Sequence, residues 1–510
     1  MRTMTKKEKP RGRKELSARG SVTIYFAMCF ALMISLIFTL LEGARIRGLK
    51  IEADRLAHAA IRSVFAEYDR KLLERYDLIM LDGGYLKGGF DISQAESRWG
   101  KFIYENTKEG GGLLSTKNFF PIHLMDDEIS EYELSTDADG APYFNMATDY
   151  MKSKMGVNAA RTLLNKLNAQ NVDDDSGNLE DTWESALDAN EALDTDEAYG
   201  EEENASITEE EKQKAEEVSE EDKGLMDNVS ELMAEGVLAL CMEDLSTVSG
   251  KGISSADLLS QRTLNAGNRP DTERETGAYR KVFFLSYIGE KFSMYGDRKG
   301  GKSALDYEME YIYAGKDTDK ENLSAVAEAL LGIREAANFA YLMTDAGKQS
   351  EARILAIAIA GLLALPAIVE AIYYGILVAW SFMESVADVR CLFSGGKVPL
   401  VKTAADWKTS LSVNAQAEEA GGGRGLDYGE YLQALLFLKS EKDLTLRSMD
   451  LIEKNIALED GYGMFRMDRC ITYAKWSADF TAGPMFMSLV GNSPGKDGYR
   501  YRSEGIYYYE

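Results

Sequence analysis

The sequence predicts an α+β protein: an N-terminal transmembrane helix that continues into a stem helix, a small sheet region, and a larger, mainly helical outer domain with C-terminal strands. Three observations predict this arrangement. Twenty residues without a charge, 22–41, precede a proline-free stretch rich in helix-forming residues. Apolar residues recur at helical spacing over most of 225–460. Aromatic and polar residues alternate within 461–510, as in β-strands with one buried face.

The charge of the chain is acidic and unevenly distributed. The 510 residues carry a formal net charge of −26, and this length favours two or three domains. Residues 1–19 contribute +6, whereas residues 173–222 contribute −20. Because an acidic body repels phosphate backbones, nucleic acid is not expected as a partner.

The cysteines and histidines exclude several kinds of site. The four cysteines are Cys29, Cys241, Cys391 and Cys470. Their wide spacing excludes a zinc site built from cysteine pairs and a dense disulfide framework, although a single disulfide remains possible. The only histidines are His58 and His123, which excludes chemistry that needs several imidazoles.

The uncharged run within 20–41 predicts a membrane anchor. At about 1.5 Å per residue, twenty helical residues span the roughly 30 Å hydrocarbon layer. The run is longer than the roughly 7–15 apolar residues of a secretory signal, and it ends without well-placed small residues for cleavage. The Lys/Arg-rich tail, 1–19, predicts a cytoplasmic N-terminus with the bulk of the chain extracellular. We therefore expect a single-pass protein of the cell membrane.

A stem helix is expected over 42–77, directly after the anchor. Apolar residues recur there near helical spacing at Leu49, Leu56, Ala60, Val64 and Leu72. This spacing predicts a helix with one buried face.

A small α+β region is expected over 78–171. Loose alternation within 118–137 predicts two short strands. The sequence DADGAPY indicates a turn, and a helix is predicted after it, over 144–170.

The acidic segment 172–224 is predicted to be a disordered linker, because it holds few large apolar residues to offset the entropy of ordering. Its DDDSGNLED sequence, 173–181, resembles a calcium loop only loosely.

Helices are predicted over 225–460 and a β-rich segment over 461–510. In one predicted helix, Thr318 or Asp319 is the N-cap. The buried face of that helix is formed by Leu323, Val326, Leu330 and Ile333.

A second apolar stretch, 354–380, has two interpretations. It is long enough to cross a membrane, but Pro366 interrupts it and Glu370 lies in its second half. Two core helices of the outer domain are favoured over a second membrane span, which would return the following residues to the cytoplasm.

One segment matches a nucleotide-binding motif letter for letter. GDRKGGKS, 296–303, places Gly296, Gly301, Lys302 and Ser303 at the spacing of a phosphate-binding loop. Such a loop follows a buried strand directly and opens a helix, whereas EKFSMY separates the strand-like VFFLSYI from Gly296. A polar glycine loop between two helices is the favoured interpretation.

Paired carboxylates at Asp306, Glu308 and Glu310 are candidates for acid–base chemistry. Because residues two apart point to different faces of a helix, solvation or ion pairs with nearby cations are favoured instead. No catalytic residue, cofactor site or metal site is expected.

The N-terminus resembles the start of pilin-like proteins of tight-adherence (Tad) pilus systems, namely their TadE- and TadG-like members. The residues that fit are Arg19, Gly20, Ser21, Val22, Thr23, Ile24, Phe26 and Ala27. The pattern departs at Tyr25, which stands where those proteins have a glutamate with a role in assembly. Processing next to Gly20 is what the resemblance would imply.

The rest of the chain resembles an uncharacterised family of Gram-positive envelope proteins, a domain of unknown function found with such pilus machinery. The shared sequences are LLEGAR, RYDLIMLD, LDYEMEYIYAGKDTDKENL, IREAANFAYL and SVADVRCLFSGGKVPLVKT. The resemblance covers most of residues 20–510 outside the acidic segment, and it implies a location at the cell surface near such pilus machinery. The expected stem helix, small sheet and following helix make a pilin-like arrangement by analogy of shape alone.

Contacts with membrane and assembly partners are expected at the anchor. Ala27, Ala31 and Ser35 recur every four residues, which allows helices to approach closely. Gly20, Tyr25 and Glu42 complete this group of candidates. The expected partners are the lipid bilayer and other envelope or pilus-assembly proteins.

The leading expectation for function is a non-enzymatic, outward-facing accessory or assembly component of a Tad-type pilus or secretion apparatus. One alternative is an envelope scaffold or adhesive ectodomain unrelated to pili. A third is a nucleotide-binding protein that uses residues 296–303.

Overall fold

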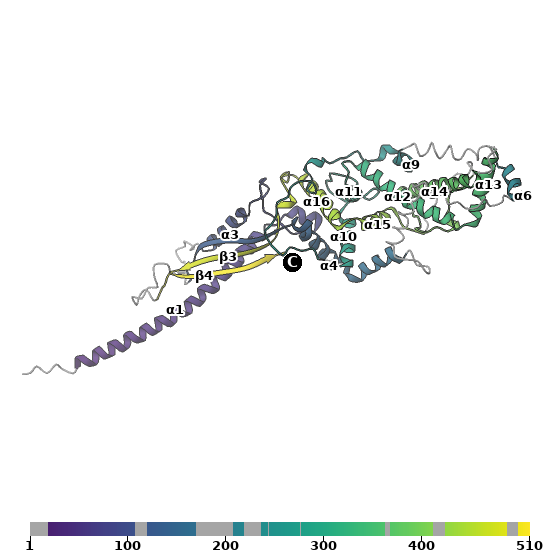
Figure 1. Cartoon of the computed structure of the whole chain (residues 1–510). Helices are drawn as coiled ribbons and strands as arrows, with labels where there is room; N and C mark the ends of the chain where they lie inside the picture. Colours follow the sequence, from purple (N-terminus) through teal and green to yellow (C-terminus); the bar gives the residue numbers. More distant parts are fainter. Residues whose placement is uncertain are drawn as a thin grey trace, which may run out of the picture.

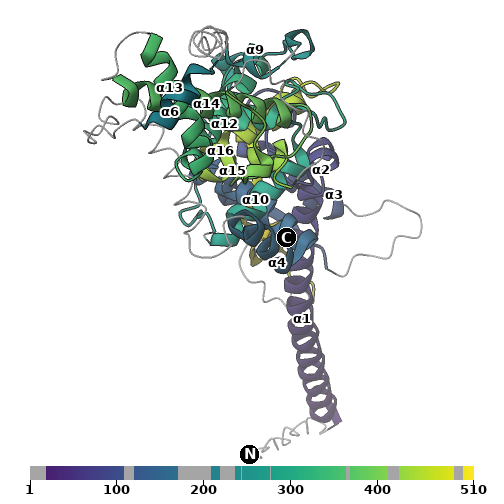
Figure 2. The same cartoon turned by 90° about the vertical axis from the view of Figure 1, so that its right-hand side faces the viewer.

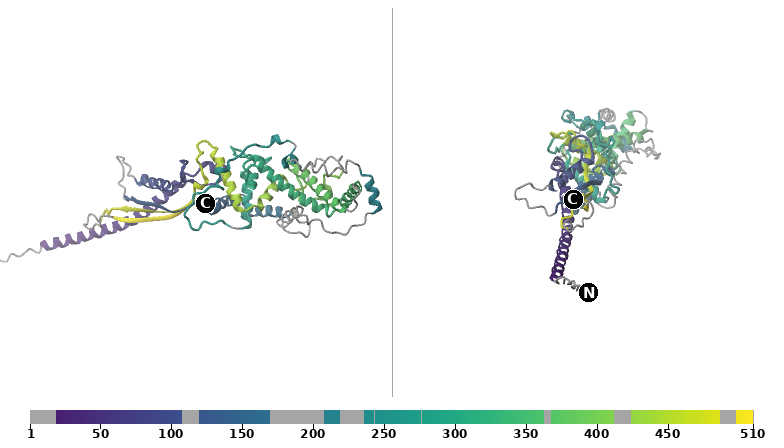
Figure 3. Two further views of the ribbon diagram at one scale, coloured as in Figure 1. Left: turned by 45° about the horizontal axis from the view of Figure 1, so that its top comes forward. Right: turned by 90° about the vertical axis from the view of Figure 1, so that its left-hand side faces the viewer.

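The molecule is elongated, with a protruding helix at one end and a helical body at the other (Figures 1 and 3). The computed structural model describes residues 19–107, 120–169, 208–218, 236–242, 244–275, 277–362, 368–411, 424–486 and 498–509. Within them the protein is mostly helical, with one small antiparallel sheet and one long apolar N-terminal helix.

Helix α1, Arg19–Phe65, runs without a break from the apolar run into the stem. Its apolar window has a mean hydropathy of 2.5, contains no buried residue, and is long and apolar enough to cross a membrane. The second half packs against the protein, with Leu49, Leu56, Ala60 and Val64 all buried. Figure 2 shows the uncovered half extending below the body toward the N-terminus.

The stem helix ends earlier than the sequence predicts. Helix α1 stops at Phe65, and a separate helix, α2 (Arg70–Tyr76), follows a short turn. The Asp69 carboxylate accepts a hydrogen bond from Leu72 N at 2.9 Å, which caps α2. Because Asp69 favours the cap over the helix interior, a single helix to Asp77 does not form.

The sheet joins the two ends of the chain. Its strands are β1 (Leu81–Asp82), β2 (His123–Leu134), β3 (Cys470–Ala482) and β4 (Tyr499–Tyr508). Strand β3 is central: it pairs antiparallel with β2 on one side, and with β1 and β4 on the other. The two short strands predicted over 118–137 are one bulged strand, and the C-terminal strands complete this same sheet.

Helices α1 and α3 (Ile92–Thr107) lie side by side on one face of the sheet (Figure 1). The central contact is Trp476 of β3, whose ring lies 5.4 Å from the ring of Trp99 and 4.8 Å from that of His58. Alternate β3 residues such as Lys475 point to the opposite, open face. This module of α1, α3 and the sheet has its own apolar core.

The helical body lies beyond the sheet. Its main helices are α4 (Asp137–Ala169), α10 (Ala278–Lys291), α11 (Glu308–Ala314), α12 (Asp319–Leu342), α15 (Tyr428–Leu438) and α16 (Glu441–Ala457), with the short α9 (Val237–Cys241). The prediction for α12 is confirmed: Thr318 is the N-cap, and the four residues predicted for its buried face are buried.

The second apolar stretch forms core helices within the described chain. Helices α13 (Ala346–Leu362) and α14 (Val369–Phe393) pack against each other, and Leu355, Ile376 and Trp380 are buried between them and their neighbours. The helices lie at the end of the molecule opposite to α1 (Figure 1). In the described residues α1 alone meets the criteria for a membrane span.

Part of the acidic segment is folded, which corrects the prediction of a wholly disordered linker. Helix α6 (Glu209–Glu216) begins with a capping box of Thr208 and Glu211, and Ala215 packs into the core with α13. Arg353 of α13 pairs with Glu211 at 3.4 Å. The calcium-like sequence 173–181 lies outside the described residues.

Candidate membrane-proximal site

A buried ion pair stands on α1 directly after the apolar run. Glu42 and Arg45 are one helical turn apart, their side chains are 2% and 1% exposed, and Arg45 Nη1 lies 3.0 Å from Glu42 Oε1. Residues next to them on α1, such as Leu41 and Ala44, are exposed. The pair is therefore covered on one face of the helix only.

The chain segment that covers the pair follows β3. Arg45 Nη1 donates a hydrogen bond to the carbonyl oxygen of Gly483 at 2.9 Å. The Glu42 carboxylate accepts hydrogen bonds from Met485 N at 3.2 Å and from Phe486 N at 2.7 Å. Both charges thus satisfy backbone groups of 483–486, some 440 residues later in the chain.

An aromatic contact extends this site into the apolar run. The ring of Phe486 stacks on the ring of Phe38, with centroids 6.0 Å apart and an interplanar angle of 28°. Glu42 was a sequence candidate, whereas Phe38, Arg45 and Phe486 were not. The charged pair in LLEGAR, directly after an uncharged run, is the signal that could have found Arg45.

The other candidates of the anchor are not drawn into this site. Gly20 belongs to the first turn of α1. Tyr25, Ala27 and Ala31 are exposed and Ser35 is half-buried, on the part of α1 that no other described element covers. Their spacing on one helix is retained, and this surface of α1 is open to other molecules.

The motif of 296–303 has a different geometry from a phosphate-binding loop. It lies between two helices, because the strand-like VFFLSYI is part of α10, where Val282, Phe284 and Ile288 are buried. Helix α11 starts only at Glu308. Gly296 and Gly301 adopt left-handed φ angles of 81° and 109°.

The two polar side chains of this motif contact the protein itself. Lys302 Nζ lies 3.3 Å from the carbonyl oxygen of Leu458 and 3.4 Å from the Asp460 carboxylate. Ser303 Oγ donates a hydrogen bond to Glu308 Oε1 at 2.7 Å. The hydroxyl that would hold magnesium in a nucleotide site thus bonds to a buried carboxylate.

Two of the three candidate carboxylates are buried, which corrects the expectation that they are solvated or paired with cations. Glu308 accepts hydrogen bonds from Ser293 N at 2.7 Å and Asn455 Nδ2 at 2.5 Å. Asp306 does form the expected ion pairs, with Lys251 at 2.8 Å and Arg298 at 3.2 Å.

Glu310 lies fully buried on the same short helix. Its Oε1 accepts hydrogen bonds from the Tyr428 hydroxyl at 2.6 Å and from Tyr295 N at 2.8 Å. Burial raises the pKa of Glu310 from 4.5 to about 7, more than the two hydrogen bonds lower it. The Glu310 side chain is 0% exposed, so its carboxyl group is closed to solvent.

A cluster of buried charges joins α12, α14 and the segment after α14. Arg334 and Asp388 are fully buried, with Arg334 Nε 3.1 Å from Asp388 Oδ2. Lys402 pairs with Asp388 at 2.7 Å and with Glu384. Arg334, Asp388 and Lys402 of this network lie within IREAANFAYL and SVADVRCLFSGGKVPLVKT, and Glu384 directly precedes the second of these segments. Sequence reasoning did not predict the network.

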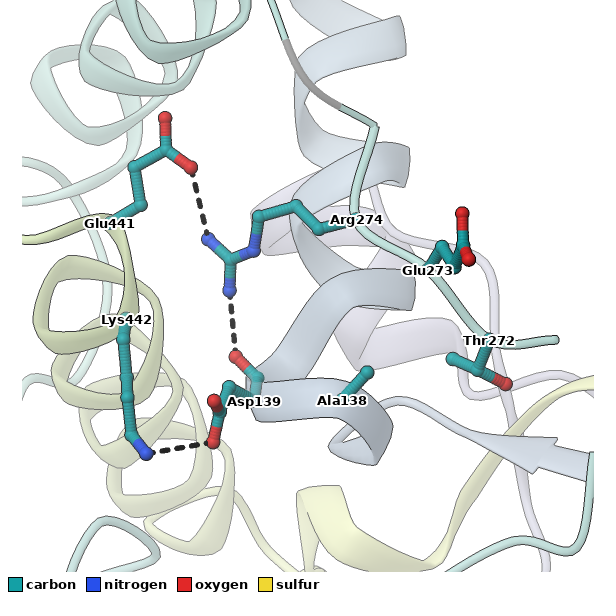
Figure 4. Close-up of a pocket in the computed structure, with 7 residues that line it drawn as sticks. All are labelled: Ala138, Asp139, Thr272, Glu273, Arg274, Glu441 and Lys442. Atoms are coloured by element: carbon teal, nitrogen blue, oxygen red, sulfur yellow. Dashed lines mark hydrogen bonds and ion pairs between the residues drawn. The ribbon is translucent and has the colours of Figure 1, made fainter. Parts of the chain in front are cut away.

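A cavity of about 530 Å³ opens between the start of α4, residues 272–274 and the start of α16 (Figure 4). Four of the side chains or backbone groups that line it, those of Asp139, Arg274, Glu441 and Lys442, contact one another. Arg274 lies 3.7 Å from Glu441 and donates a hydrogen bond to the carbonyl oxygen of Asp139 at 2.8 Å, and Lys442 pairs with Asp139 at 2.9 Å. No ligand is assigned to this cavity.

Other candidate groups lie apart. His58 is on α1 and His123 opens β2. All four cysteines are free thiols. Among the described residues, no three His, Cys, Asp or Glu side chains gather in an arrangement that could hold a metal ion.

The comparisons with known proteins give one match. A family model described as a family of unknown function (DUF5702) matches residues 214–482, which is more than half of the chain. The matched region begins in α6 and ends at the last residue of β3. No curated protein and no solved structure matches the chain.

Proposed function

The chain belongs to DUF5702, a family of unknown function, and we propose that this member is a single-pass membrane protein that acts as a non-enzymatic accessory or assembly component of a Tad-type pilus or secretion apparatus. The basic tail lies in the cytoplasm, and the sheet and the helical body form an extracellular ectodomain. The partners are the lipid bilayer and other envelope or pilus-assembly proteins.

The observation that carries the proposal is helix α1. One half is apolar and none of its membrane-length window is buried, and the other half packs onto a small antiparallel sheet without a break between them. Uncovered apolar residues in water are unfavourable by about 25 cal/mol per Å², so this half requires lipid or other helices. One continuous helix with an apolar half and a half packed on a small sheet is a pilin-like arrangement.

The N-terminal sequence supports the same assignment. Eight positions from Arg19 to Ala27 fit the pattern of TadE- and TadG-like proteins, and the basic tail before them favours a cytoplasmic N-terminus. Tyr25 replaces the glutamate of that pattern, so assembly through that glutamate is not part of the proposal.

An envelope scaffold or adhesive ectodomain is the second candidate, since the described chain forms an elongated body at one end of α1 (Figure 1). A nucleotide-binding role has less support, because Lys302 and Ser303 are engaged within the protein. ATP with magnesium should leave the melting temperature unchanged. A stabilisation that disappears in Lys302→Ala would revive that third candidate.

Two experiments test the proposal. Protease treatment of intact cells should digest the chain after residue 42 and spare the tail, and protection of the ectodomain would show that the orientation is wrong. Affinity purification from membranes should recover pilus-assembly proteins. Recovery of the intact ectodomain at the surface without them would favour the scaffold role.

A further inference from the structure

We propose that the end of the β3–β4 hairpin, residues 483–486, is a second membrane-contact site, which enters the lipid interface beside α1. The inference rests on the membrane anchor of the proposed function and adds a contact that the anchor does not require. Its partner is the lipid bilayer itself.

The depth of the hairpin end follows from its contact with α1. Phe38 lies within the apolar run, four residues before Glu42, which corresponds to about 6 Å along a helix axis. Because the ring of Phe486 stacks on Phe38, it lies at the same depth. If residues 22–41 span the hydrocarbon layer, Phe486 is therefore below its outer boundary.

Three backbone groups at the hairpin end form hydrogen bonds to side chains of α1. Irregular backbone at membrane depth is tolerated only where its polar groups are satisfied within the protein. Glu42 accepts hydrogen bonds from the amides of Met485 and Phe486, and Arg45 donates one to the carbonyl group of Gly483. In water these three backbone groups would need no such partners.

The burial of the Glu42–Arg45 pair also fits a position at the lipid interface. A second pair on α1, Glu52 and Arg55, has the same spacing, but Arg55 is 62% exposed and the pair contacts water. Glu42 and Arg45 are nearly fully covered, and each charge is neutralised by the other. The side chain of Met485 remains on the outside of the hairpin end, where it is 37% exposed. An exposed apolar side chain beside internally paired charges fits a lipid surface.

The test measures the depth of residue 485 in vesicles. Met485→Cys, in a chain that also carries Cys29→Ser and Cys391→Ser, is labelled with an environment-sensitive fluorophore and reconstituted in phosphatidylcholine vesicles. Lipids with a spin label near the headgroup end of the acyl chain should quench the fluorophore at residue 485. This quenching should be several-fold stronger than that of the same fluorophore at Ile506→Cys, an exposed site near the other end of β4.

A third site separates this inference from the proposed function. Leu32→Cys reports the centre of the apolar run of α1, which must be quenched by lipids with a spin label near the end of the acyl chain if α1 spans the bilayer. One outcome is quenching at residue 32 together with quenching at residue 485 that is no greater than at residue 506. This result would overturn the second contact and leave the anchor intact. It would assign the hairpin end to solvent or a protein partner. No quenching at 32 would overturn the anchor and this inference together.

A matched pair of variants tests the mechanism. Glu42→Ala leaves two amides without an acceptor, so quenching at 485 should fall several-fold, while quenching at 32 is retained. Glu52→Ala removes the equivalent carboxylate of the exposed pair and should change neither signal. Equal quenching at 485 in both variants would contradict the role of Glu42 in holding the hairpin end.

Discussion

Buried charged residues stabilise the helical body through partners that lie far away in the sequence. Arg334 on α12 bonds to Asp388 on α14 and to the carbonyl oxygen of Leu400. Removing one partner of a buried ion pair lowers the free energy of unfolding, because neither water nor another group replaces that partner. Arg334 is the clearest case.

Arg334→Ala should destabilise the protein by about 3–5 kcal/mol, because it leaves Asp388 in a fully buried network that has lost one of its cations. The measurement is the free energy of unfolding in denaturant. Arg55→Ala, which breaks the exposed pair with Glu52, should change it by less than about 1 kcal/mol. Equal effects of the two substitutions would show that the buried network contributes nothing.

Glu310 should make stability depend on pH between about 4.5 and about 7. Its pKa is higher in the folded protein than the ordinary 4.5, so the native state binds this proton more tightly than the unfolded chain. The stabilising effect is complete below 4.5 and is lost as the pH rises through about 7. One pKa unit is about 1.4 kcal/mol, so the loss is roughly 3 kcal/mol.

The comparison that isolates this effect is between wild type and Glu310→Gln. The amide introduced by this substitution keeps an oxygen that can accept from Tyr428 and Tyr295, but it does not titrate. Melting temperatures measured from about pH 4.5 to about pH 8 should fall less steeply in the variant. Parallel curves for the two proteins would assign the pH dependence to other carboxyl groups.

Helices and strands differ in how far the sequence predicts them. The spacing of Leu323, Val326, Leu330 and Ile333 predicts α12 together with its cap, because both signals are local. The run VFFLSYI resembles a strand but forms α10, since it is buried on nearly all sides and periodicity then carries no information. The early end of α1 depends on the capping side chain of Asp69.

Thr318→Ala should lower the free energy of unfolding by about 1 kcal/mol, because the side chain of Thr318 accepts a hydrogen bond from Glu321 N and the Glu321 carboxylate bonds back to Thr318 N. Denaturant midpoints of purified variants measure this effect. Lys320→Ala, an exposed change in the same turn, should stay within about 0.5 kcal/mol. If Lys320→Ala is the more damaging of the two, the capping box does not stabilise α12.

Segments from near the two ends of the chain contact each other in the folded molecule. Strand β2 near the N-terminus pairs with β3, and Leu134 is opposite Ile471. Alternation predicts each strand, but no local pattern shows which strands pair across such a separation. The contact between Glu42 and Phe486 was not predicted for the same reason, since the two residues belong to opposite ends of the chain.

Removing β4 by ending the chain at Ala482 should loosen the sheet module while the helical body stays folded. Strand β4 covers Phe65 of α1, with Tyr507 stacked on it at 4.3 Å. Limited proteolysis with mass spectrometry should find new cleavage within 42–107 and unchanged protection within 277–362. Deletion of residues 1–18 is the control and should alter neither region. Unchanged protection of 42–107 in the shortened chain would mean that β4 is dispensable.

The central position of β3 also determines when the sheet can form during synthesis of the chain. Ribosomes produce α1 and β2 early, and more than three hundred residues must follow before β3 is made. Until then the apolar side of the stem has no sheet to complete its cover. A product that ends before β3 lacks the strand with which β1, β2 and β4 all pair, so this sheet cannot form in it.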